Sequence, residues 1–144
     1  MKTYIPVSFF LILLITFICG SCKKIDQSTS VSQELIGTWK LTEFGTDDNG
    51  NGKIDSWELS QVAAGLDDEL TFSKNGQGKE ITKENNASSL ELDFYWSVSG
   101  ADSVYRIGTG HEDITYYISN IGSSNLSMLE ETTSGLVGYV YTRK

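Results

Sequence analysis

The chain has 144 residues, and 19 Asp and Glu residues against 11 Lys and Arg give it a formal net charge of −8. This length is sufficient for one domain and leaves little for a second. The acidic balance argues against a nucleic-acid partner, because nucleic acids bind basic surfaces. With one His and two Cys, the composition also excludes a His-rich metal centre, a four-cysteine site and a disulfide framework.

Residues 1–21 are predicted to be a lipoprotein signal peptide. A positively charged start precedes an apolar stretch from Ile5 to Ile18, and the small residue Ser21 stands directly before Cys22. This order resembles the bacterial lipobox, in which the cysteine receives a diacylglyceryl group and the chain is cut just before it. The alternative is an uncleaved anchor helix, although the apolar segment is at the lower limit of length for a membrane span.

Lipidation of Cys22 would give the mature chain a stable anchor, because several acyl chains on one residue exceed the marginal hold of a single chain. The segment 22–34 is rich in Ser, Thr and Gln with almost no apolar content, so it is predicted to be a flexible tether. The folded domain is then expected over residues 35–144. We expect a lipid-anchored protein of the cell envelope, in the outer membrane, on its periplasmic or surface face.

From Leu35 onward the dominant sequence period is two, which is typical of strands with one buried face. The clearest example is 90–98, where large apolar residues alternate with mostly polar ones. Turn signals separate the segments, and the only stretch predicted to be helical is Trp57 to Ala64. Further strands are predicted at 37–45, 68–73, 77–84, 103–108, 112–119, 124–132 and 135–143.

About eight short antiparallel strands with one apolar face can form a closed barrel or a sandwich. No segment has room for a parallel crossover, which needs at least about ten to twelve residues. Closure is favoured because it removes the unpaired edges of the sheet. The predicted fold is therefore all-β, an eight-stranded antiparallel up-and-down barrel with one short helix after the first strand. Such a barrel is either packed with side chains or holds one small ligand.

Several stretches carry a family resemblance when they are taken in order. They are the opening strand with Gly37 and Trp39, the segment 67–76, the strand with Trp96, and the closing residues 139–143. This set resembles the small lipocalin-like lipoproteins common in Bacteroidota and supports the barrel. The resemblance implies that Trp39 packs at the closed end of the barrel, under Arg143, through a cation–π contact. Gly37, Trp39 and Arg143 would then be structural residues. The alternative is a core Trp39 with Arg143 as a solvated terminal charge.

The segment 47–58 matches an EF-hand calcium loop at every diagnostic position. Gly52 permits the sharp turn at the sixth position, and Ile54 is expected to point into the core from the eighth. Calcium prefers six to eight hard oxygen ligands, and the spacing of the loop directs such atoms to one centre. The predicted ligands are the side chains of Asp47, Asn49, Asn51, Asp55 and Glu58 and the backbone carbonyl of Lys53.

The loop also departs from a full EF-hand, because a predicted strand precedes it and no second loop is present to pair with it. These departures favour a structural calcium site over a sensor switch. Two of the ligands, Asn49 and Asn51, are neutral, which should weaken binding toward a dissociation constant of ~10⁻⁴–10⁻³ M. The alternative is an Asn- and Gly-rich turn with no ion.

No set of nucleophile and base is visible, so we do not expect an enzyme. His111 is the only His and lies between Gly110 and Glu112, in a predicted turn. The expected function is non-catalytic binding, either of a small hydrophobic ligand in the barrel or of an envelope protein at its rim. The alternative is a structural or accessory lipoprotein whose barrel is packed. Four large side chains would fill so small a lumen, namely those of Trp39, Phe72, Phe94 and Trp96.

Overall fold

The computed structural model describes residues 27–85, 87–100, 102–108 and 113–144. The predicted signal peptide, the lipidation site Cys22 and His111 lie outside these residues. Among the described helices, none is long and apolar enough to cross a membrane.

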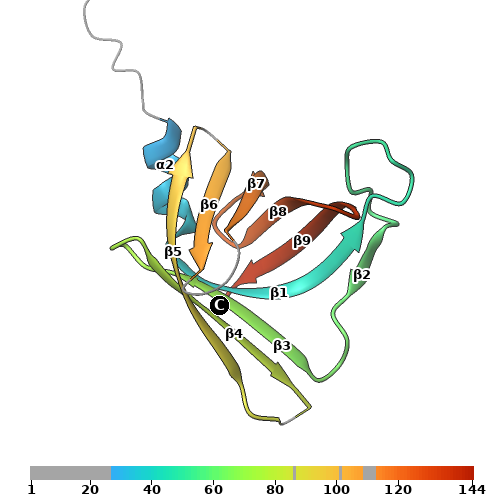
Figure 1. Ribbon diagram of the computed structural model, residues 1–144, viewed down its shortest axis with the longest axis horizontal. Coiled ribbons are helices and arrows are strands. Elements are labelled where there is room, and N and C mark those ends of the chain that lie inside the picture. The colour runs from blue at the N-terminus through green and yellow to red at the C-terminus, as the bar shows by residue number, and fades with distance from the viewer. Residues whose placement is uncertain (1–26, 86, 101, 109–112) are drawn as a thin grey trace, which may run out of the picture.

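The described chain has one helix followed by nine strands (Figure 1), and each strand predicted from alternation is present within two residues of its expected bounds. Apolar residues at every second position place one face of each strand in a common core. The elements are α2 (Gln27–Leu35), β1 (Gly37–Thr46), β2 (Leu59–Gln61), β3 (Leu66–Phe72), β4 (Gln77–Glu84), β5 (Leu90–Ser99), β6 (Ser103–Gly108), β7 (Ile114–Ile121), β8 (Asn125–Thr132) and β9 (Gly135–Arg143).

All strand pairings are antiparallel, and β9 returns to pair with β1, which closes the sheet into a barrel. The other edge of β1 is shared, because β3 pairs with residues 37–40 and β2 pairs with residues 43–45. Strands β2 and β3 therefore act as one interrupted strand. The fold class is confirmed as a closed eight-stranded antiparallel barrel.

The position of the helix has to be corrected. Residues Trp57 to Ala64, predicted to be helical, form a turn and then strand β2, and the described helix lies before β1. The reason is tertiary, because the C-terminal half of β1 offers a free edge whose backbone groups require partners. Strand β2 fills that edge, and Gln61 adds a side-chain hydrogen bond to Glu43.

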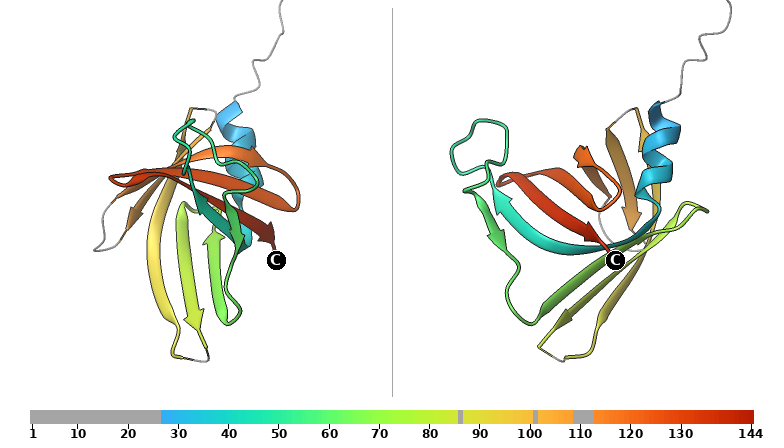
Figure 2. Two further views of the ribbon diagram at one scale, coloured as in Figure 1. Left: turned by 90° about the vertical axis from the view of Figure 1, so that its right-hand side faces the viewer. Right: turned by 180° about the vertical axis from the view of Figure 1, so that it is seen from behind.

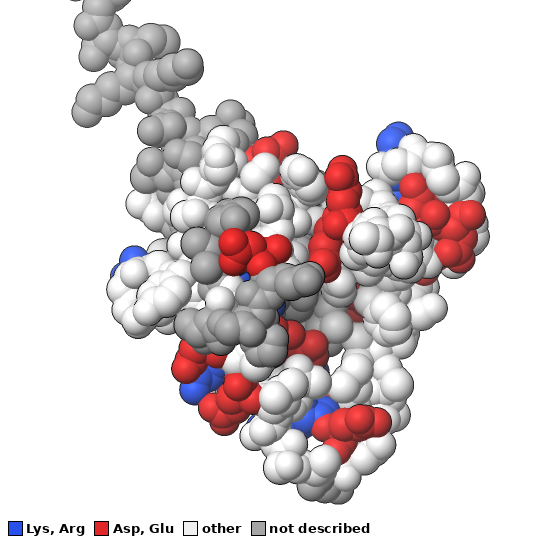
Figure 3. Space-filling model, in the orientation of Figure 1, with Lys and Arg blue, Asp and Glu red and all other residues white. Residues whose placement is uncertain are grey.

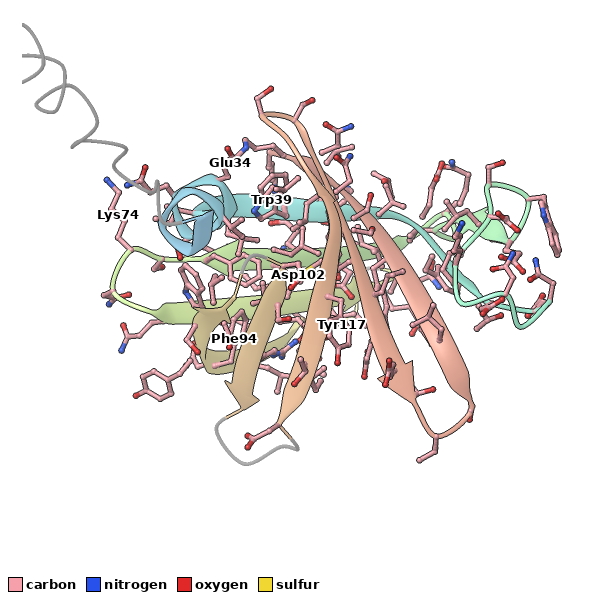
Figure 4. All side chains as sticks on the ribbon, turned by 90° about the horizontal axis from the view of Figure 1, so that it is seen from above. Glu34, Trp39, Lys74, Phe94, Asp102 and Tyr117 are labelled. Atoms are coloured by element: carbon pink, nitrogen blue, oxygen red, sulfur yellow. The ribbon has the colours of Figure 1, made fainter. Side chains whose placement is uncertain are left out.

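Helix α2 occupies much of the segment 22–34 that was predicted to be a flexible tether. Its only two apolar residues, Val31 and Leu35, are spaced by one helical turn and are buried, with 9% and 0% of their surfaces exposed. The helix packs against β5 and β7 at one end of the barrel. Figure 4 shows Trp39 directly beside this helix. The tether is therefore shorter than its composition indicated.

The end of the barrel under α2 is filled by side chains. Trp39 and Phe94 are fully buried, and the Phe72 ring meets Phe94 and Trp96 edge-on at centroid distances of 5.8 and 5.4 Å. The Trp96 ring is partly buried, and its indole nitrogen donates to the carbonyls of Ser73 and Gln77. All four predicted filling residues thus pack at this end, and a ligand would have to enter from the opposite end.

Candidate functional site

The half of the barrel away from α2 has charged side chains facing its interior. Residues that pair across antiparallel strands share one face of the sheet. Core residue Leu70 pairs with Glu80, so Glu80 faces inward from β4. Asp68 lies two residues before Leu70 and faces inward from β3. Both carboxylates are partly buried and stand above the apolar packing.

Arg106 projects into the same region from β6, in phase with the fully buried Val104. Only 8% of its surface is exposed. The guanidinium forms an ion pair with Glu80 and lies 4.4 Å from the centre of the Phe94 ring. Arg106 also bonds to the Tyr116 hydroxyl. The guanidinium therefore lies between the apolar packing, where it contacts Phe94, and the charged region, where it pairs with Glu80.

The third side of this region is formed by β7, β8 and β9. Tyr116 pairs directly with Glu130, and the Tyr139 hydroxyl donates to Glu130 Oε2 at 2.9 Å. The rings of Tyr116 and Tyr139 meet edge-on at 6.0 Å, and Tyr141 lies 6.5 Å beyond Tyr139. We name the inward-facing set the lumen cluster, which consists of Asp68, Glu80, Arg106, Tyr116, Glu130 and Tyr139.

The lumen cluster is acidic, with the three carboxylates of Asp68, Glu80 and Glu130 against the guanidinium of Arg106. Burial, with repulsion from Glu80, raises the pKa of Asp68 to about 6, and the attraction of Arg106 offsets this only in part. Oxygen Oδ1 of Asp68 exposes less than 1 Å² and has no hydrogen-bond partner among the described residues. Burial also raises the pKa of Tyr116 to about 12 and raises that of Tyr139.

Sequence reasoning missed this cluster, although its signal is present in the chain. In β8, Glu130 continues the inward phase of Leu126 and Met128, and in β6 Arg106 continues the phase of Val104. A charged residue in the buried phase of an alternating strand is unusual, because burying a charge without a partner is costly. These two charged residues at inward-facing positions were the sequence signal for a polar barrel interior.

The loop 47–58 joins β1 to β2 and projects on the side of the barrel away from α2 (Figures 1 and 2). The Asp47 carboxylate accepts from the backbone N–H groups of Asn51 at 3.0 Å and Gly52 at 2.7 Å. The side-chain amides of Asn49 and Asn51 both donate to Asp55 Oδ2 at 3.0 Å. These contacts fold the first nine positions of the loop into a ring.

Glu58 closes the loop. Its carboxylate is 7% exposed and accepts from the backbone N–H groups of Asp48 and Asp55 at 2.9 and 2.7 Å. Lys53 is exposed and donates its backbone N–H to Asn51 Oδ1 at 2.9 Å. The structure thus gathers the predicted ligand residues in one hydrogen-bonded loop. Within the described residues, however, no three acidic, His or Cys side chains are placed to hold a metal ion between them.

The loop rests on the outer wall of the barrel. Ile54, expected to point into the core, packs on β9 instead, where a Cβ on Gly138 would lie 2.6 Å from Ile54 Cγ1. The backbone of Asp47 donates to the Leu136 carbonyl at 3.0 Å. The absence of a side chain at Gly138 therefore allows the loop to seat against the strand. Figure 3 shows carboxylate groups on the exposed part of this loop.

The closed end brings together the three residues that the resemblance implied to be structural. The Arg143 guanidinium lies over the Trp39 ring, and a Cβ on Gly37 would lie 2.6 Å from Arg143 Nη1. Gly37 also has a φ of +141°, a region that residues with side chains rarely adopt. These three residues form the junction between α2 and the barrel, outside the lumen cluster.

The fold is thus a small closed barrel whose interior is apolar next to α2 and charged farther from it. A family model described as the lipocalin-like domain matches residues 35–128. The chain therefore belongs to the lipocalin-like domain family. Comparison with curated proteins gave no match.

Solved structures with a similar fold include proteins from bacteria and an animal. A lipocalin-like protein from Bacteroides uniformis is 14% identical, with 77% of this chain and 99% of that chain covered and a TM-score of 0.56. An uncharacterized protein from Bacteroides eggerthii is also 14% identical, with coverage of 76% and 99% and a TM-score of 0.54. Lobster apocrustacyanin A1 is 10% identical, with coverage of 87% and 72% and a TM-score of 0.50. At these identities the likeness shows the fold alone.

Proposed function

We propose that this protein is a membrane-anchored lipoprotein of the cell envelope that binds a small ligand in its barrel without catalysis. The observation that carries this function is the lumen cluster. Asp68 and Glu80 face the interior yet remain partly exposed, so solvent reaches them. A barrel whose only role is structural would gain stability from apolar side chains at these positions. The partly open, polar half therefore favours a binding function over the packed, accessory alternative.

The ligand has an apolar part, because apolar and aromatic side chains flank the lumen cluster. Leu92 pairs with Glu80, and Ile114 pairs with Arg106, so both share the inward face. Phe44 pairs with Tyr139 and is 43% exposed. Binding sites of this kind are mainly apolar, with a few polar groups that fix orientation.

Native mass spectrometry tests the binding function on residues 23–144, which contain every described helix and strand, purified from the source cells without detergent. We expect an adduct of defined small mass that is lost on denaturation. A matched variant, Thr82→Trp, places a large ring beside Asp68 on the inward face and should reduce the adduct. An unoccupied parent protein, or one that carries only a partner protein, would support the accessory alternative.

We also propose that the loop 47–58 binds calcium. Its donor set suits a hard cation, with carboxylates from Asp47, Asp55 and Glu58 and a carbonyl at Lys53. The amide nitrogens of Asn49 and Asn51 converge on one oxygen of Asp55. A half-turn of each amide would present oxygen in their place and would give up the bonds that the two amide oxygens accept from the backbone N–H groups of Asn51 and Lys53. Binding of calcium would thus require rotation of these side chains only, and the role of the ion would be structural.

The anchor completes the proposed function. Lipidation of Cys22 accounts for the short apolar segment that ends in a small residue before a cysteine. Helix α2 begins at Gln27, so the chain between Cys22 and the helix spans at most ~18 Å when fully extended. The closed end of the barrel would therefore lie near the membrane, and the open half would point away from it.

A further inference from the structure

We propose that the lumen selects a small organic cation, an ammonium group joined to an apolar body. This inference rests on the proposed binding function and names the class of its ligand. Three observations support it: the excess of carboxylates in the lumen cluster, the contacts that Arg106 already makes with Glu80 and Phe94, and the apolar residues around the cluster.

The single buried cation of the cluster is already engaged. Arg106 is paired with Glu80 and stacked on Phe94, so its charge is directed at one carboxylate and one ring. Glu130 receives a hydrogen bond from the neutral hydroxyl of Tyr139, and within the part of the chain that the structure describes it forms no such ion pair. Asp68 keeps a buried oxygen without any hydrogen bond from the described residues. Among the described residues, Asp68 and Glu130 therefore form no ion pair with a cation inside the barrel, and Arg106 compensates Asp68 only in part.

Uncompensated carboxylates in a partly desolvated site favour a ligand of opposite charge. An ammonium group supplies both the charge and the N–H donors that Asp68 lacks. The ring of Tyr139 is partly exposed, and the face of an aromatic ring attracts cations. An anionic ligand would add repulsion from Asp68 and Glu130, and only Arg106 could oppose it.

The surroundings indicate an organic cation and not a metal ion. The side chain of Leu92, which pairs with Glu80, supplies apolar surface and no further oxygen ligand. Leu90 pairs with Thr82, which in turn pairs with Asp68, so an apolar side chain lies on the same inward row as the carboxylate. Leu90 is 58% exposed and Phe44 is 43% exposed, so apolar surface is available toward the open end. An amphiphile with its ammonium inward and its apolar part outward matches this order.

The test uses three probes with the same ten-carbon chain: decylammonium, decanol and decanoate. Their binding to residues 23–144 is measured by calorimetric titration near neutral pH, below the concentrations at which they form micelles. We expect decylammonium to bind at least ~10-fold more tightly than decanol, because its charge is opposite to that of the carboxylates. Decanoate should bind most weakly, because its carboxylate would be buried beside charges of the same sign. Asp68→Asn should remove most of the preference, and Glu130→Gln should reduce it.

Glu91→Gln is the matched control, because Glu91 lies on the outer face of β5 and is paired with Lys79. It removes the same charge from the chain as the lumen variants and should leave the preference unchanged. Equal binding of the three probes, or an Asp68→Asn variant with full preference, would overturn the cationic ligand while leaving an apolar binding function. Failure of all three probes to bind would count against the proposed function as well.

Discussion

The Arg143 guanidinium lies 4.1 Å from the centre of the Trp39 ring, and it also joins two separate backbone segments, the α2–β1 junction and the turn before β8. Its nitrogens donate to the carbonyls of Glu34 at 2.6 Å, Ile36 at 2.8 Å and Ser123 at 2.7 Å. The Trp39 indole nitrogen donates to Leu35 at 2.7 Å. Unpaired carbonyls at the end of a helix favour a cation, so Arg143 caps α2 and fixes it to the barrel.

This relationship predicts a graded loss of stability at the closed end. Trp39→Ala should lower the free energy of unfolding by ~3–5 kcal/mol, because it removes a buried indole and leaves a cavity. Arg143→Ala should lower it by ~2 kcal/mol, because several carbonyls lose a charged donor. Arg143→Lys keeps the charge but loses the planar guanidinium, so its free energy of unfolding should lie between those of the parent and of Arg143→Ala. Urea unfolding of the three variants measures these differences.

Thr142→Ala serves as the control for this series, because Thr142 is exposed and lies on the outer face of β9. Its effect should stay within ~0.5 kcal/mol. If Arg143→Ala proved as mild as Thr142→Ala, the cap on α2 would contribute no stability, and Arg143 would be only a solvated terminal charge.

Asp68 predicts a pH-dependent stability that an exposed carboxylate would not produce. Its folded-state pKa of about 6 exceeds the ordinary value of 3.8. As pH rises between these values the unfolded chain loses the proton first, so Asp68 reduces stability progressively, and the reduction is complete above the folded-state pKa. Repulsion from Glu80 and Asp67 acts in the same direction as burial, and Arg106 opposes them.

Asp68→Asn removes this titration. The variant should therefore melt at a higher temperature than the parent near pH 7.5, with a gain of ~1 kcal/mol after allowance for the partial exposure of the group. Below about pH 4 the gain should vanish, since both folded and unfolded Asp68 are then protonated. Thermal melts at the two pH values decide the matter, and a variant that is less stable than the parent at pH 7.5 would contradict the burial argument.

The lipid anchor predicts different outcomes for the two cysteines of the chain. Cys22→Ser should abolish both uptake of labelled fatty acid and partition of the protein into detergent, because it removes the acceptor thiol. Cys19→Ser should retain both, since that residue would be cut away with residues 1–21. Labelling that persists in Cys22→Ser would show that the anchor has been assigned to the wrong residue.

The strands could be predicted from sequence because each carries a local pattern, as in β8, where Leu126 and Met128 alternate with polar residues. The helix α2 could not be predicted, because only Val31 and Leu35 of its nine residues are apolar. Their burial stabilises the helix only once the barrel end that they cover has formed. Strand β2 was missed for a similar reason, since its pairing with β1 is nonlocal. The lumen cluster required knowing which phase of each strand faces inward.

Calcium at the loop 47–58 should stabilise the barrel, because the loop closes onto both β1 and β9. Asp47 donates to the Leu136 carbonyl, and Ile54 seats on Gly138. Calcium that binds only the folded loop raises stability by mass action. With ~1 mM calcium and a dissociation constant of ~0.1 mM the gain is ~1.4 kcal/mol. That corresponds to a rise of ~3–6 °C in Tm for a domain of this size.

The calcium response should depend on loop carboxylates and not on charge in general. The Asp48 and Asp55 N–H groups bond to different oxygens of Glu58, so Glu58→Gln keeps an acceptor for only one of them. It also loses the bidentate charge, so it should erase the response. Asp48→Ala removes a carboxylate that accepts a hydrogen bond from Thr46 and lies outside the ligand set, so this variant should retain the calcium response.

Terbium gives a second readout, because Trp57, 66% exposed and adjacent to Glu58, can sensitise its luminescence. Magnesium should do less than calcium, since it sheds water reluctantly. Melting curves that coincide in calcium and in chelator, with no sensitised luminescence, would reduce the loop to a hydrogen-bonded turn.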